Sequence, residues 1–102
     1  MTFEIKIKAG FFKTQPYYLT IETRQIILTP QSEAENGRVV IDDKDLKAVS
    51  IISKNMNSSE IEIITYSNTY IGSINSENDL KEITRHLAQE FGGKFILQCG
   101  NV

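Results

Sequence analysis

The feature that most restricts the fold of this chain is a change in its apolar pattern at Ser76. Before Ser76, apolar and polar residues alternate in short runs, and this period of two is typical of strands with one buried face. After Ser76, apolar residues recur at helical spacing, at Leu80, Ile83, Leu87 and Phe91. The pattern therefore predicts a mainly β protein with one C-terminal helix, at about residues 76–91.

Seven strands are expected within residues 2–75. The first is the clearest, because Phe3, Ile5 and Ile7 alternate with charged residues. Gly10 within the same run suggests a bulge or bend, and Asn36-Gly37 marks a later turn. The other strands are expected in a hairpin at 16–31 and in the runs 39–41, 48–53, 60–66 and 69–75. Seven short strands with apolar inner faces favour a curved, partly closed sheet.

The apolar residues of segment 16–31 predict the register of its hairpin. If Thr23 and Arg24 form the turn, the apolar residues on one face of the two strands meet in pairs. These pairs are Tyr17 with Pro30, Leu19 with Leu28, and Ile21 with Ile26. A two-residue turn usually contains Asn or Gly, so a longer loop is an open alternative.

Local signals also place the last turn and the ends of the helix. A turn at Ser67 and Asn68 is expected to pair Ile61 with Ile74, Ile63 with Gly72, and Ile64 with Ile71. Ser76 and Asp79 fit a capping box at the helix start, and two glycines supply a stop. The tail at 92–102 either adds an extended segment or lies over the sheet.

Length and composition indicate one domain over residues 1–102. The net charge is −2, which disfavours a nucleic-acid-binding function because such proteins usually carry a basic excess. A single cysteine cannot form an intramolecular disulfide. Charged residues interrupt the N-terminal apolar run, and no segment approaches the ~20 apolar residues of a membrane span. We therefore expect a cytoplasmic protein without a transmembrane segment.

The order of seven strands and a final helix resembles that of pleckstrin-homology-like domains. The stretch YYLTIETRQIILTP is also similar to the hairpin of the GRAM and bacterial pleckstrin-homology groups, through Leu19, Thr20, Arg24, Ile26, Ile27 and Leu28. The resemblance implies a seven-stranded antiparallel curved sheet or partly open barrel capped by the helix, acting as a non-enzymatic binding module. Many eukaryotic members carry a Trp in the final helix. This chain has none, so Leu87 or Phe91 is expected in its place.

Four basic residues form the first candidate site: Lys6, Lys8, Lys13 and Arg24. Lys6 and Lys8 share the outward face of the first strand, where they are placed to meet an acidic partner. Anionic lipid or phosphoinositide headgroups are the alternative ligands, expected at Lys6, Lys8 and Lys13. An ordinary solvated strand face, whose lysines discourage edge pairing, also fits the pattern.

Apolar residues expected near the surface form the second candidate site, and they favour protein interaction or self-association. They are Tyr18, Tyr66, Tyr70, Phe95, Ile96 and Leu97, with Phe12 beside them. Tyrosines near turns suit protein contacts, and an apolar tail can add to the edge of a neighbouring sheet. Ordinary packing of the core and tail is the alternative.

The residue pattern predicts neither a catalytic site nor a metal site. His86 and Cys99 lack a third group that would orient the base, and two ligands are too few for zinc. Asp42, Asp43 and Asp45 lack the glycine and the later glutamate of a calcium-binding EF-hand loop. We therefore expect a protein that is not an enzyme and that binds no cofactor or metal.

Overall fold

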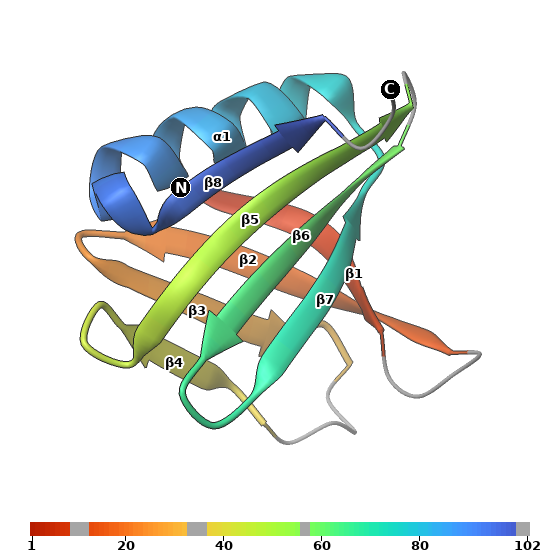
Figure 1. Cartoon of the computed structure of the whole chain (residues 1–102). Helices are drawn as coiled ribbons and strands as arrows, with labels where there is room; N and C mark the ends of the chain where they lie inside the picture. Colours follow the sequence, from red (N-terminus) through yellow and green to blue (C-terminus); the bar gives the residue numbers. More distant parts are fainter. Residues whose placement is uncertain (9–12, 33–36, 56–57, 100–102) are drawn as a thin grey trace.

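The computed structural model of the chain describes residues 1–8, 13–32, 37–55 and 58–99 (Figure 1). These residues form eight β-strands, one α-helix and one short 3-10 helix. In chain order the elements are β1 (Thr2–Lys8), β2 (Thr14–Glu22), β3 (Gln25–Pro30), β4 (Val39–Asp42), β5 (Leu46–Asn55), β6 (Ser58–Thr65), β7 (Thr69–Ile74), α1 (Glu77–Phe91), η1 (Gly92–Lys94) and β8 (Phe95–Cys99). The bend predicted at Gly10 and the Asn36 part of the predicted turn lie outside the described residues.

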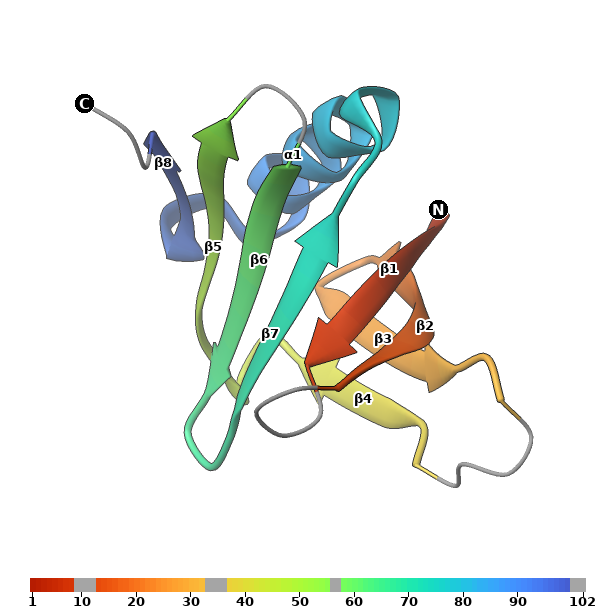
Figure 2. The ribbon, with the colours of Figure 1, turned by 90° about the vertical axis from the view of Figure 1, so that its right-hand side faces the viewer.

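The described strands form a single sheet, in the order β4-β3-β2-β1-β7-β6-β5-β8. β1 pairs with β2 on one side and with β7 on the other, so it joins the two halves of the sheet. Figure 2 shows these halves as two layers, with α1 across one end of the space between them. β4 and β8 are the two ends of the order. The sheet is therefore curved but open.

The core fills the space between the two halves. In β1 the predicted alternation is confirmed, because Phe3, Ile5 and Ile7 are buried while the residues between them are exposed. Each of the other strands except β8 adds at least one buried apolar side chain to the same cluster, including Leu19, Ile26, Leu28, Ile41, Leu46, Val49, Ile51, Ile61, Ile63 and Ile74. Apolar burial of this kind is the main force that holds the two halves of such a small sheet together.

Helix α1 forms where the sequence predicts it and covers the core with its apolar side. Ile83, Leu87 and Phe91 are buried, and Leu80 packs against the core while remaining partly exposed. At the first turn, the Asp79 amide donates to Ser76 Oγ at 3.2 Å, as a capping residue requires. At the other end, Gly92 adopts φ 50° and its amide donates to the Ala88 carbonyl.

The first hairpin has the predicted register. Ile21 lies opposite Ile26, Leu19 opposite Leu28, and Tyr17 opposite Pro30. The turn contains only Thr23 and Arg24, so the longer loop does not occur. Arg24 takes the left-handed conformation, φ 54°, in place of the Asn or Gly that is usual there. The apolar pairs therefore set the register despite an unfavourable turn residue.

The predicted register of the β6–β7 hairpin is wrong by two residues. Ile61 lies opposite Gly72 and Ile63 opposite Tyr70. The turn begins one residue earlier than predicted, because the Thr65 amide donates to the Asn68 carbonyl at 2.8 Å. The Thr65 hydroxyl also accepts from the Asn68 amide at 2.9 Å. These bonds make Tyr66 and Ser67 the turn residues.

The predicted count of seven strands is also wrong, because the tail supplies an eighth. After α1 and η1, β8 runs parallel to β5, from the pair Val49–Phe95 to the pair Ser53–Cys99. β5 would otherwise present a long unpaired edge, and β8 satisfies the backbone groups along half of it. Of the two alternatives for the tail, the extended segment is therefore the one that forms.

Candidate functional site

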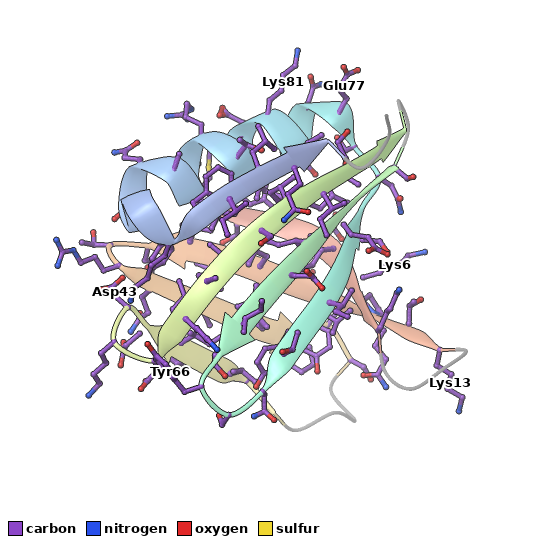
Figure 3. All side chains as sticks on the ribbon, viewed as in Figure 1. Lys6, Lys13, Asp43, Tyr66, Glu77 and Lys81 are labelled. Carbon is purple, nitrogen blue, oxygen red and sulfur yellow. The ribbon has the colours of Figure 1, made fainter. Side chains whose placement is uncertain are left out.

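The structure does not gather the four predicted basic residues into one patch. Lys6 and Lys8 lie on the exposed face of β1, and the Lys8 ammonium is 3.3 Å from a Glu60 carboxylate oxygen. Figure 3 shows Lys6 and Lys13 on the same side of the molecule. Arg24 lies in the turn at the opposite end of β2 from Lys13. Binding of anionic headgroups by the three lysines stays a prediction.

Arg24 instead belongs to a cluster that ties the first hairpin to the end of α1. Its amide donates to a Glu90 carboxylate oxygen at 3.1 Å, and its carbonyl accepts from the Asp43 amide at 3.0 Å. Lys94 donates to the Asp43 carbonyl and lies 3.5 Å from its carboxylate. These residues surround an open pocket of about 440 Å³. Because Glu90, Asp43 and Lys94 already bond within the protein, the cluster holds the fold together.

The three predicted tyrosines lie in two places. Tyr66, labelled in Figure 3, is 74% exposed. Together with Tyr70 and Asp45 it lines a pocket of about 270 Å³ between β4 and the β6–β7 turn. Tyr18 lies apart, on the outward face of β2, opposite Glu4 of β1 and Thr29 of β3. The tyrosines therefore do not form one interaction patch.

The three predicted tail residues are adjacent on β8. Phe95 packs against the core, whereas Ile96 is 42% and Leu97 59% exposed. β8 is the last strand in the sheet order, so one of its edges pairs with β5 and the other pairs with no strand in the described part of the chain. The N–H and C=O groups on that free edge are available for another strand.

The exposure of Leu97 is unusual for its position in the sheet. Leu97 lies beside Ile51 of β5, which is fully buried in the core, so both side chains stand on the core side of the sheet. Residues of helix α1 and Leu97 line the same open pocket, so the helix does not cover this side chain. The result is an open groove of about 450 Å³ between α1 and β8, lined by Ile51, Ser53, Leu80, Lys81, Thr84, Arg85 and Leu97.

The lining of this groove is mainly apolar, with charge only at its helix side. Leu80, Ile51 and Leu97 provide the apolar part, from three different elements. Arg85 pairs with Glu82 on the same helix at 2.9 Å. Figure 3 shows Lys81 pointing away from the sheet. We call the free edge of β8 together with this groove the β8 surface.

The β8 edge also lacks the features that usually prevent strands from pairing with other molecules. Edge strands are commonly protected by a charged residue, a proline or a bulge. The five residues of β8, FILQC, contain no charge and no proline, and their pairing with β5 is regular. Sequence reasoning found the tail residues but missed Ile51 and Leu80 as their neighbours. The placement of the tail beside α1 was not readable from the sequence.

The remaining polar candidates include His86 on α1 and the aspartates at the end of β4 and in the turn after it, Asp42, Asp43 and Asp45. Among residues 1–8, 13–32, 37–55 and 58–99, no three His, Cys, Asp or Glu side chains are placed to hold a metal ion. The His86 ring stands 6.4 Å from the Phe3 ring, in a tilted arrangement. No helix in the described part of the chain has the length and apolar content needed to cross a membrane.

No protein-family model matches this chain, and no curated protein matches its sequence.

Proposed function

We propose that this chain is a non-enzymatic binding module with a pleckstrin-homology-like fold, which binds another polypeptide by strand addition at the β8 surface. The observation that carries the proposal is the exposure of Leu97. This apolar residue lies on the core side of an end strand, yet it is 59% exposed. The order of seven antiparallel strands, β4-β3-β2-β1-β7-β6-β5, followed by a helix, supports the family resemblance.

Strand addition uses both components of the β8 surface. An extended chain beside β8 bonds to the free backbone groups, and each such bond contributes about 1 kcal/mol net. The exposed parts of Ile96 and Leu97 together amount to about one whole side chain. Burying that area contributes roughly 1.5–3 kcal/mol. Association entropy offsets much of this sum, so we expect binding of modest affinity.

The groove gives the proposal its side-chain specificity. Side chains of an added strand alternate between the two faces of the sheet, so every second one points to the side of Leu97 and Leu80. An apolar side chain there covers Leu97, whereas a basic one loses hydration and meets the like charges of Lys81 and Arg85 on the helix side of the groove. The expected partner is therefore an extended segment with apolar residues at alternate positions.

Selection from a library of displayed random peptides tests this function. Peptides enriched on the wild-type protein should carry alternating apolar residues and should shift the backbone NMR signals of β8. Leu97→Lys should weaken their binding at least ~10-fold, because a lysine on an edge opposes strand pairing. Tyr18→Lys introduces a lysine at another exposed position, on β2, whose two edges are both paired, and should leave binding unchanged. Failure to enrich any peptide, or equal binding to both variants, would refute the proposal.

A further inference from the structure

We infer that the strand added at the β8 surface is β8 of a second copy of this chain, paired antiparallel about a two-fold axis through Leu97. The inference rests on the proposed function, because it uses the same edge and groove. It names the partner, and it fixes the register in which the two copies meet.

The register follows from the length of β8. Two copies of a five-residue strand overlap completely in antiparallel pairing only when the middle residue meets itself. The middle residue of Phe95–Cys99 is Leu97. Ile96 of one copy then lies opposite Gln98 of the other. About four to six backbone hydrogen bonds form, depending on which residues point their N–H and C=O groups outward.

The sequence of β8 is compatible with pairing to itself. Like charges that face each other across two strands destabilise a sheet, and β8 contains no charged residue. In the full overlap, therefore, no charge opposes its own copy. An acidic or basic strand from an unrelated protein would gain no ionic partner within β8 either. The edge itself thus favours an uncharged strand, and β8 is such a strand.

The two exposed apolar side chains of β8 both gain a neighbour in this dimer. Leu97 meets Leu97 of the second copy on the groove side, because residues opposite each other in a pair point to the same face. This contact covers the opening beside Leu80 and Ile51. On the other face, Ile96 packs beside the aliphatic part of Gln98 of the second copy. The two sheets become continuous across the axis.

Sedimentation equilibrium of the full chain over a wide concentration range tests self-pairing. The contact is short, so the wild type should change from monomer to dimer at roughly micromolar or higher concentration. Leu97→Lys places two lysines face to face on the axis and should weaken the dimer at least ~10-fold. Tyr18→Lys should not change it. Circular dichroism should show that both variants are folded, because both side chains are exposed.

Disulfide trapping tests the register. In a Cys99→Ser background, which removes the only natural cysteine, Leu97→Cys should form a covalent dimer on mild oxidation. Residues opposite each other have Cβ atoms about 4.5–5.5 Å apart, which is close to the span of a disulfide. Ile96→Cys should cross-link more slowly, since position 96 of the second copy lies diagonally across the axis and not directly opposite. Tyr18→Cys is the control for random collision.

The outcomes separate this inference from the proposed function. A wild type that stays monomeric, or a dimer that Leu97→Lys leaves intact, overturns pairing through β8. Faster cross-linking of Ile96→Cys than of Leu97→Cys overturns the two-fold axis at Leu97. If the protein is monomeric but selected peptides bind and shift the β8 signals, strand addition survives and only the identity of the partner falls.

Discussion

Three leucines that differ in burial provide a quantitative test of how α1 seals the core. Leu87 is completely buried, Leu80 on the same helix is partly exposed, and Leu97 of β8 is 59% exposed. Replacing a buried leucine by alanine lowers the free energy of unfolding by about 3 kcal/mol, because the cost of the cavity left behind adds to the loss of apolar burial. At Leu80 the space is already open to the groove, so Leu80→Ala leaves no closed cavity and should cost about 1 kcal/mol.

Urea unfolding followed by far-ultraviolet circular dichroism measures these differences, since the chain has no tryptophan to report fluorescence. A domain of this size has a free energy of unfolding of about 5–15 kcal/mol, so Leu87→Ala removes a large part of it. In heating experiments the same loss lowers Tm by roughly 10–20 °C. The measurements need a low protein concentration, at which the proposed β8 dimer would add no stability and Leu97→Ala should be nearly neutral. Equal losses for the Leu87 and Leu80 variants would refute this description of the helix contact.

Three further predictions concern local features and use the same unfolding assay, with control variants for two of them. Gly72→Ala should lower the free energy of unfolding by about 1–3 kcal/mol, because a Cβ there would lie 3.2 Å from the Ile7 side chain. Gly93→Ala is the matched control, since its Cβ would meet no heavy atom within 4 Å; an equal loss would contradict the packing argument. Arg24→Gly should raise stability by roughly 0.5 kcal/mol, because glycine accepts the φ of 54° without steric cost, and a loss would show that the arginine side chain stabilises the turn. Ser76→Ala should cost about 1 kcal/mol and Ser76→Asp much less, so equal costs would exclude capping as the reason.

Features governed by neighbouring residues were predictable from the sequence. The β2–β3 register follows from three apolar pairs across one turn, and the start of α1 follows from Ser76. In the β6–β7 hairpin the turn was placed one residue too late, and this moved every predicted pair by two positions. A shift of two preserves which side chains face the core. The predicted pairs therefore joined residues that do share a face, even though the pairing itself was wrong.

Features governed by distant parts of the chain were not predictable in this way. β8 pairs with β5 in parallel, and a parallel pair has no connecting turn from which its register can be deduced. The groove combines Leu80, Ile51 and Leu97, whose proximity depends on that pairing. The four basic residues looked like one patch because they are close in sequence. The length of β2 nevertheless separates Arg24 from the lysines.

The position of β1 between β2 and β7 has a consequence for synthesis on the ribosome. Among the described strands, β1 emerges before the others, whereas β7 is the last of the antiparallel ones. The nascent chain can form β1 to β4 as successive hairpins, but one side of β1 must wait until translation has passed β7. A ribosome that stalls in β5 or β6 would thus hold a half-built sheet with a bare inner face, the kind of intermediate that chaperones bind.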